Sequence, residues 1–74
     1  MSKPKVLVGV ADGSEEIEVV TIIDTLVRGG AEVVVASVMG KKEVKCSRGV
    51  KLVADCLISE CSESSWDMIC VPGG

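Results

Sequence analysis

Three glutamates fall within four positions of the segment Gly13-Ser14-Glu15-Glu16-Ile17-Glu18. Acidic side chains are favoured at the start of a helix, and two of them are enough to fill that role. Glu18 lies one turn further in, where a carboxyl group with apolar neighbours is kept protonated by desolvation and can donate a hydrogen bond. We therefore take Glu18 as the candidate catalytic acid, with a solvated helix residue as the alternative.

The second group with chemical potential is the diglycine of Pro72-Gly73-Gly74. Glycine lets the backbone approach a ligand closely, and its N–H groups can then stabilise a developing oxyanion. Gly73 and Gly74 are accordingly the candidate backbone donors. An ordinary turn at these positions remains the alternative.

Three strands and a helix must position these residues. Nearly continuous apolar runs at 5–10, 32–37 and 67–71 predict buried strands of a parallel sheet. Carboxyl ends of parallel strands share one rim, where ligands bind in α/β folds. The remaining segments are 43–46 and 50–54, predicted as a small hairpin, and 55–66, predicted as a loop with a helical turn.

Apolar residues at helical spacing predict a helix from about Glu15 to Arg28. Ser14 is the expected N-cap, and Gly29-Gly30 is the expected left-handed stop. Glu15 and Glu16 are then expected to be surface charges at the positive end of the helix dipole.

Composition limits the classes of function. The chain has 74 residues, a formal net charge of −3 and an apolar fraction of 47 %. This is at most one small domain, and its charge does not favour nucleic acid or an anionic membrane as a partner. No apolar run approaches the roughly 20 residues that span a bilayer. The N-terminal segment lacks the pattern of a secretory signal, so we expect a cytoplasmic protein.

The four cysteines, at positions 46, 56, 61 and 70, form no metal-binding pattern, because there is no C-x-x-C pair and no histidine. Without a secretory signal we expect all four to be reduced thiols. The segment between Gly9 and Gly13 does not fit the dinucleotide fingerprint, and there is no phosphate-binding-loop lysine motif. A response-regulator receiver domain would need an acidic pocket with a phosphoacceptor aspartate near the end of a strand, and only Asp12 supports that interpretation. The sequence therefore predicts neither a metal nor an organic cofactor.

One predicted helix can cover only one face of three buried strands, whereas a parallel sheet needs both faces covered. The bare face would expose more apolar surface than a monomer usually tolerates. We therefore expect residues 1–74 to be the N-terminal part of a single larger α/β domain, with the remaining polypeptide of that domain as a partner.

The order of these segments resembles the ThiJ/PfpI superfamily, and within it the DJ-1/YajL-like branch that includes a parkinsonism-associated protein. The resemblance covers all 74 residues. It implies a flavodoxin-like, doubly wound parallel-sheet sandwich that is incomplete in this chain and is usually homodimeric. The segments that carry it are Gly13–Glu18, Leu26–Gly30, Val33–Ser37, Cys46–Asp55 and Asp67–Gly74.

The resemblance also implies roles for particular residues. Glu18 matches a protonated acid that hydrogen-bonds a reactive cysteine, and that cysteine lies beyond residue 74. Gly73 and Gly74 match a turn whose N–H groups lie beside it. Arg48, and Arg28 from the second copy of a dimer, match arginines near the pocket that can meet an anion. The first helix and the hairpin match the elements that carry the dimer contact.

The family's activities imply an enzyme acting on reactive carbonyls, either as a cofactor-independent glyoxalase on methylglyoxal or as a deglycase on glycated proteins. In that chemistry a thiolate attacks the aldehyde carbon and Glu18 moves protons. The alternatives are a redox-sensing chaperone with little turnover and a thiamine-pathway protein of thiazole monophosphate synthesis. Protease or amidotransferase-like chemistry is a further possibility for the superfamily.

Overall fold

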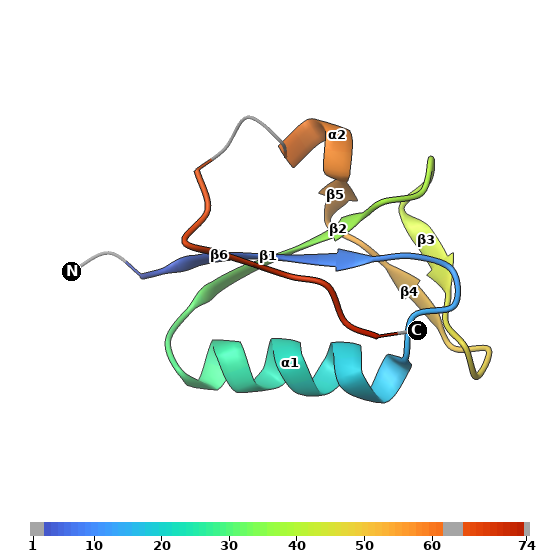
Figure 1. The fold of residues 1–74 in the computed structure, drawn as a ribbon, viewed down its shortest axis with the longest axis horizontal. Helices are drawn as coiled ribbons and strands as arrows, with labels where there is room; N and C mark the ends of the chain where they lie inside the picture. Colours follow the sequence, from blue (N-terminus) through green and yellow to red (C-terminus); the bar gives the residue numbers. More distant parts are fainter. Residues whose placement is uncertain (1–2, 62–64, 74) are drawn as a thin grey trace.

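The computed structural model describes residues 3–61 and 65–73. A four-stranded sheet and a separate two-stranded hairpin make up its β structure (Figure 1). The elements are β1 (Lys5–Val10), α1 (Glu16–Arg28), β2 (Glu32–Ser37), β3 (Glu43–Lys45), β4 (Lys51–Val53), β5 (Cys56–Leu57), α2 (Ile58–Cys61) and β6 (Met68–Cys70). The predicted α/β class, with its βαβ unit and hairpin, is confirmed.

The four-stranded sheet is parallel, in the order β5-β2-β1-β6. β1 lies at its centre and pairs with β2 from Lys5–Glu32 to Val10–Ser37. On its other side β1 pairs with β6, placing Val8 opposite Cys70. The carboxyl ends of β1 and β6 therefore lie at the same edge of the sheet, as the candidate site requires.

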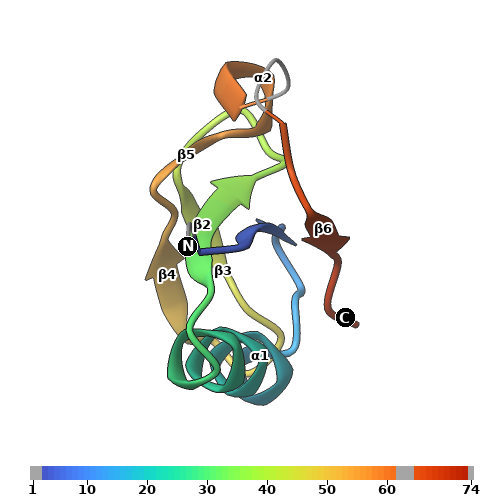
Figure 2. The same cartoon turned by 90° about the vertical axis from the view of Figure 1, so that its left-hand side faces the viewer.

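The sheet lies between α1 on one face and α2 on the other (Figures 1 and 2). Alternate β1 residues point to opposite faces. Val6, Val8 and Val10 join Val19 of α1 in one buried cluster. Leu7 points the other way and packs in a second cluster with Ala36 and Cys61. The second face, expected to be bare, is thus partly covered by the α2 segment and by Trp66.

The two ends of α1 differ in how well they were predicted. Ser14 is not the N-cap, because its hydroxyl accepts a hydrogen bond from the Ala11 N–H instead; Glu15 occupies the cap position and makes no side-chain cap. The C-terminal stop is confirmed at Gly30, which has a φ of 93°. Its N–H donates to the Val27 carbonyl, and the Ala31 N–H donates to the Leu26 carbonyl. This pair of hydrogen bonds is a Schellman motif.

β5 and β6 depart from the predictions. β5 was expected to be loop, and its two residues are too few to give a periodic signal. β6 exists as expected, but the prediction that it is buried is wrong for this chain: Met68, Ile69 and Val71 are exposed. Among the described residues, β6 is an edge strand that pairs with β1 alone. The apolar run therefore correctly predicted a strand, but it did not show whether other elements cover that strand.

The cysteines are not all reduced. Cys56 and Cys61 form a disulfide, whereas Cys46 and Cys70 are free thiols. The expectation of reduced thiols is therefore wrong for the first pair. The two paired residues are 5 positions apart, and the direct passage from β5 into α2 brings their sulfur atoms together.

Within residues 3–61 and 65–73, no helix is both long and apolar enough to cross a membrane. The same residues contain no cluster of three potential metal ligands among His, Cys, Asp and Glu side chains.

Candidate active site

A hollow of about 250 Å³ opens at the carboxyl edge of the sheet. Its walls come from the end of β1 and the loop after it, from the residue that follows β2, and from the segment that follows β6. Most of the lining is apolar side chain or backbone. The lining residues are Gly9, Val10, Ala11, Asp12, Gly13, Ser14, Val38, Val71 and Pro72.

Glu18 is not among the lining residues, but it contacts the segment after β6, whose Val71 and Pro72 do line the hollow. The Gly73 N–H donates a hydrogen bond of 3.0 Å to the Glu18 Oε1 atom. In return the Gly73 carbonyl accepts from the Glu15 N–H at 2.8 Å. The first turn of α1 and the end of the chain thus meet as the topology led us to expect, although 55 positions separate Glu18 from Gly73.

This contact bears on the predicted role of the diglycine. The Gly73 N–H is already engaged by a carboxylate, so it can serve an oxyanion only if Glu18 moves or gives up that bond. Gly74 lies outside the described residues. The Glu18 side chain is exposed, so its carboxyl group is open to a ligand, and the apolar surroundings expected around it are not supplied by the described part of the chain.

Glu16 has a role that the sequence analysis did not predict. Its carboxylate accepts hydrogen bonds from the N–H groups of Arg48, at 2.9 Å, and Val50, at 3.3 Å. The Ser47 hydroxyl lies 3.0 Å from it and shares its single proton with the Glu15 carboxylate at 2.5 Å. The residue is 8 % exposed. Glu16 therefore fastens the tip of the β3–β4 hairpin to the start of α1 and is not a surface charge.

Two opposing influences act on the pKa of Glu16. Burial raises it, but hydrogen bonds from its own backbone N–H and from Ser47, Arg48 and Val50 stabilise the ionised form. Together the hydrogen bonds prevail and hold the pKa below its ordinary value. Glu16 is thus an anion fixed by donors, which suits a structural role better than proton transfer.

The same junction is held by the loop that follows β1. The Gly13 N–H donates to the Lys45 carbonyl at 2.8 Å, and the Lys45 N–H donates to the Asp12 carboxylate at 3.0 Å. Gly13 has a φ of 89°, a conformation that favours glycine. The hairpin is therefore attached to both the loop and the helix that border the hollow.

Comparison with known proteins decides the family. The sequence pattern of the DJ-1/PfpI family matches residues 4–74. The chain belongs to this family. The resemblance seen in the order of the segments is confirmed.

The family relatives agree in sequence and in structure. Protein DJ-1 homolog B of Arabidopsis thaliana is 55 % identical over 71 residues, which is 96 % of this chain and 16 % of the relative. Oxidised Toxoplasma gondii DJ-1 superposes with a TM-score of 0.93 at 59 % identity, covering 96 % of this chain and 39 % of that one. The flavodoxin-like fold class is thereby confirmed.

A third DJ-1/PfpI relative bears a functional name. It is the glutathione-independent glyoxalase DJR-1.2 of Caenorhabditis elegans, 38 % identical over 63 residues, or 85 % of this chain and 33 % of the relative. The chain thus spans between about a sixth and two fifths of the relatives and structures named here.

The two arginines that the family resemblance singled out lie at different places. Arg48, at the hairpin tip, is close to the site: its Nη1 atom lies 3.7 Å from the Glu15 carboxylate, and its side chain is 74 % exposed. Arg28 lies at the other end of α1, about 15 Å along the axis from Glu18, and pairs with Asp24. Within one chain the structure therefore does not bring Arg28 to the hollow.

The free thiols of this DJ-1/PfpI chain are poorly suited to act as a nucleophile. Burial, followed by the negative charges of Glu16, Asp12 and Glu15, raises the pKa of Cys46 above its ordinary value. Cys70 is half-buried within β6, and its thiol lies 3.4 Å from the Met68 sulfur. Neither Cys46 nor Cys70 lines the hollow.

Proposed function

We propose that this chain supplies the acid and the turn of a cysteine-dependent active site acting on reactive carbonyls such as methylglyoxal. The contact between Glu18 and Gly73 at the edge of the hollow carries this proposal. The DJ-1/PfpI membership and the glyoxalase name of a relative support the substrate class. The nucleophilic cysteine is contributed by polypeptide beyond residue 74.

The cysteines of this chain support that last point. Cys46 has a raised pKa, Cys70 lies within a strand, and the other two are joined to each other. A nucleophile needs thiolate character and access to its substrate. Polypeptide entering over the hollow would also shield Glu18 from water, which is the condition for a protonated carboxyl group.

The chemistry assigns one task to each group. The thiolate attacks the aldehyde carbon of methylglyoxal, and Glu18, acting as an acid, gives its proton to the resulting alkoxide to form a hemithioacetal. Glu18 then transfers a proton from that carbon to the adjacent carbonyl carbon through an enediol, which gives a lactoyl thioester. Water hydrolyses the thioester, releasing lactate and restoring the thiol. No metal or organic cofactor enters these steps. Oxyanion stabilisation falls to the backbone N–H of Gly74, and to that of Gly73 once Glu18 releases it.

The decisive experiment compares methylglyoxal consumption by the full-length protein and by its Glu18→Ala and Glu18→Gln variants. Loss of a general acid–base group lowers the rate about 100-fold or more. Glu32→Ala is the matched control, because Glu32 is an exposed acid at the opposite end of the sheet. No consumption by the wild-type protein would refute the enzyme reading.

The second candidate is a redox-sensing chaperone with little turnover, which the exposed apolar residues of α1 and β6 favour. In that case the cysteine oxidises and Glu18 donates a hydrogen bond to the sulfinate. Mass spectrometry after peroxide treatment tests this hydrogen bond. The Glu18→Ala variant should accumulate a smaller amount of the cysteine sulfinate than the wild type. Equal sulfinate formation would argue against Glu18 as the donor in either function.

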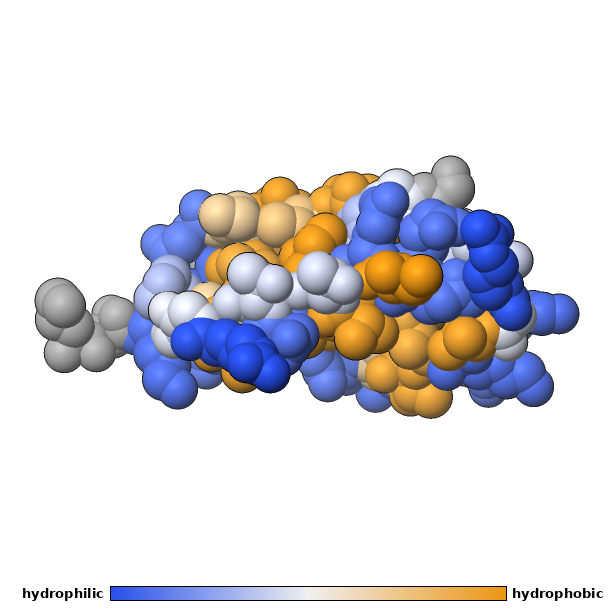
Figure 3. All heavy atoms as spheres, turned by 90° about the horizontal axis from the view of Figure 1, so that it is seen from below, coloured by the Kyte–Doolittle hydropathy of each residue, from blue (hydrophilic) through white to orange (hydrophobic). Residues whose placement is uncertain are grey.

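We also propose a homodimer formed through α1 and the hairpin. Ile17 is 74 % exposed, and Val20 and Val50 lie beside it around a second hollow of about 360 Å³. Figure 3 shows apolar surface on the face that carries α1, and exposed apolar surface of this kind favours a second copy. The α1 helix of that copy would bring its own Arg28 side chain near the pocket. Val20→Asp should convert dimer to monomer in sedimentation velocity, while Met39→Asp, in the loop after β2, should not.

The cytoplasm is the compartment we propose. The free thiols of Cys46 and Cys70 support it, whereas the Cys56–Cys61 disulfide fits the cytoplasm only as a reversible bond. Cell fractionation with a compartment marker tests it.

A further inference from the structure

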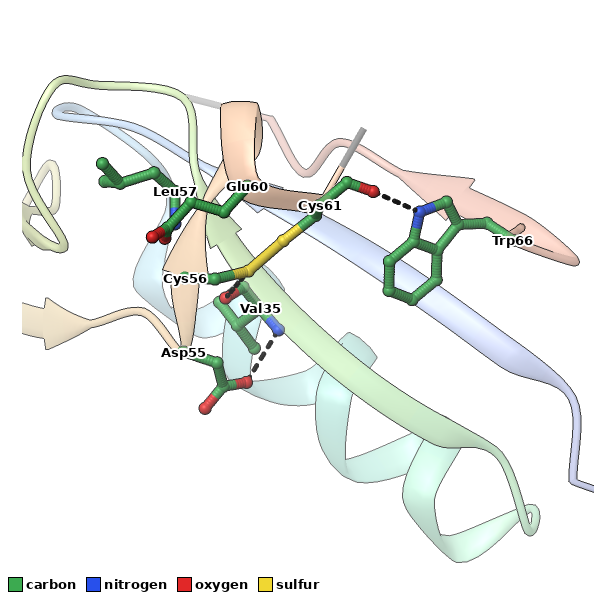
Figure 4. The surroundings of a disulfide bond; sticks show 7 residues. All are labelled: Val35, Asp55, Cys56, Leu57, Glu60, Cys61 and Trp66. Atoms are coloured by element: carbon green, nitrogen blue, oxygen red, sulfur yellow. Dashed lines mark hydrogen bonds between the residues drawn. A yellow bond between two sulfur atoms is a disulfide. The ribbon is translucent and has the colours of Figure 1, made fainter. Parts of the chain in front are cut away.

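Cys56 and Cys61 form a second chemical feature that the carbonyl chemistry does not use. They connect β5, an edge strand of the sheet, to α2 on the face opposite α1 (Figures 1 and 4). Neither cysteine lines the hollow beside Glu18. We propose that this pair is a reversible dithiol–disulfide site, a redox centre separate from the nucleophile of the active site.

The frame around the pair does not depend on the sulfur–sulfur bond. The Asp55 N–H donates to the Val35 carbonyl at 2.8 Å, and the Val35 N–H donates to the Asp55 carboxylate at 2.9 Å. The Leu57 N–H donates to the Glu60 carboxylate at 2.7 Å. Figure 4 shows the Asp55 carboxylate at the Val35 nitrogen and the Glu60 carboxylate near Leu57, both away from the sulfur–sulfur bond. Reduction therefore leaves the turn from β5 into α2 in place.

A turn that persists after reduction keeps the two thiols close together. The second step of oxidation is then intramolecular and proceeds at a high effective concentration. A thiol at Cys56 also has an acceptor nearby, because its sulfur lies 4.0 Å from the Val35 carbonyl oxygen. Both redox states can thus be accommodated by the same backbone, which is the property that a reversible pair requires.

The two sulfur atoms differ in access, and this sets the order of the reaction. Cys61 is buried, with 6 % of its surface exposed, whereas Cys56 is half-buried at the sheet edge. Cys56 is therefore the residue that meets the oxidant, and Cys61 is the resolving residue.

With glutathione disulfide as oxidant, the reaction balances in two exchanges. The Cys56 thiolate attacks one glutathione sulfur, forming a mixed disulfide and expelling one glutathione thiolate. The Cys61 thiolate then attacks the Cys56 sulfur and expels the second glutathione thiolate. Two electrons pass from the protein to glutathione disulfide, and the two protons lost by the thiols are taken up by the glutathione thiolates.

The pair lies under the cover of the second sheet face. Cys61 is buried with Leu7 and Ala36, and α2 is a single helical turn of 4 residues. An isolated turn of this length is not stable in water, so its packing and hydrogen bonds hold it in both redox states, and the disulfide adds a covalent link. Trp66 packs against the same cluster, and its indole N–H donates to the Cys61 carbonyl at 3.1 Å (Figure 4). Trp66 is the sole tryptophan in the sequence and reports on this state.

The test is a redox titration of the full chain in mixtures of reduced and oxidised glutathione. Thiols are trapped by alkylation, counted by intact mass, and compared with Trp66 fluorescence. We expect one two-electron transition in which two alkylation sites disappear together, with the fluorescence changing at the same midpoint. Cys56→Ser and Cys61→Ser should each abolish it, and Cys70→Ser, a free thiol elsewhere in the sheet, should preserve it.

Several results would overturn the proposal. Two thiols that remain open to alkylation at every glutathione ratio would show that the pair does not form. A bond that excess dithiothreitol cannot reduce without denaturant would be a structural crosslink. Persistence of the transition in Cys61→Ser, or its loss in Cys70→Ser, would assign it to other cysteines. If circular dichroism shows that Cys61→Ser is unfolded, the test rests on Cys56→Ser, which changes the more exposed position. Persistence of the transition in folded Cys56→Ser would then overturn the proposal.

Discussion

Glu16 and Glu18 stand two positions apart on α1, yet they have different surroundings. Glu16 is buried and accepts hydrogen bonds from a hydroxyl and two backbone N–H groups of the hairpin tip. Glu18 is exposed and accepts one from Gly73. The first carboxylate is fully used by its own fold, whereas the second remains open to a ligand. Of two neighbouring acids, the one with fewer partners is therefore the better candidate for chemistry.

The largest expected effect is from Glu16→Gln. A neutral amide cannot accept all the donors now aimed at the carboxylate, and its NH2 group would face some of them. We expect a clear fall in melting temperature and faster amide hydrogen exchange at 47–50. Glu15→Gln is the comparison variant, because that side chain is more exposed and contacts the hairpin tip through the Ser47 hydroxyl and the Arg48 guanidinium, whereas Glu16 holds the backbone. An equal fall in melting temperature in the two variants would show that Glu16 contributes no more to stability than Glu15.

The pH dependence of stability sharpens the same contrast. The pKa of Glu16 in the folded state is lowered from an ordinary value of 4.5. Its contribution to stability is therefore fully present above pH 4.5 and is lost as the pH falls through the folded-state pKa. In urea titrations at stepped pH, the stability difference between wild type and Glu16→Gln should narrow below pH 4.5. A constant difference would exclude this linkage.

Gly73→Ala tests the other acid. A Cβ atom at this position would lie 3.0 Å from the Glu18 Oε1 atom, so the carboxylate must shift and its hydrogen bond must lengthen. Because the contact is exposed, we expect a loss of about 1 kcal/mol or less in the free energy of unfolding. The rate of methylglyoxal consumption by the full-length protein should fall by a larger factor than this small loss of stability would cause. Gly40→Ala is the control, since nothing lies within 4 Å of its added Cβ atom.

The smallest effect on stability is expected from Arg48→Ala. The Arg48 backbone N–H, which the substitution retains, is the group that holds Glu16. The side chain contributes an exposed ion pair with Glu15 at 3.7 Å, and exposed pairs are worth about 0.5 kcal/mol or less. Thermal denaturation should be almost unchanged. A large loss would mean that the guanidinium group, and not the backbone, holds this junction together.

Sequence patterns predicted the elements whose signals are long and local. β1 and β2 are nearly continuous apolar runs of six residues, and α1 has apolar residues at helical spacing over 13 residues. Gly30 has the conformation that the stop of a helix requires. The position of Glu18 followed from topology, because strands that end at one edge of a sheet bring their loops together.

The features that were missed depend on distant or very short segments. Glu16 is defined by donors 31 to 34 positions away, and nothing local separates it from Glu15. β5 has two residues, too few for a period-two pattern. The Cys56–Cys61 bond depends on β5 passing directly into α2, so the missed strand also concealed the pair. Ser14 was misassigned because its hydroxyl has the Ala11 N–H as a competing partner.

The reach of the contact between Glu18 and Gly73 has a consequence for biosynthesis. The Glu16 junction is complete once the ribosome has released the polypeptide through Val50, so α1 and the hairpin can assemble early. Gly73 must emerge before the opposite wall exists, and closing so long a loop is slow. The Glu16 junction therefore needs only the first 50 residues, whereas the proposed site cannot form until Gly73 has emerged and paired with Glu18.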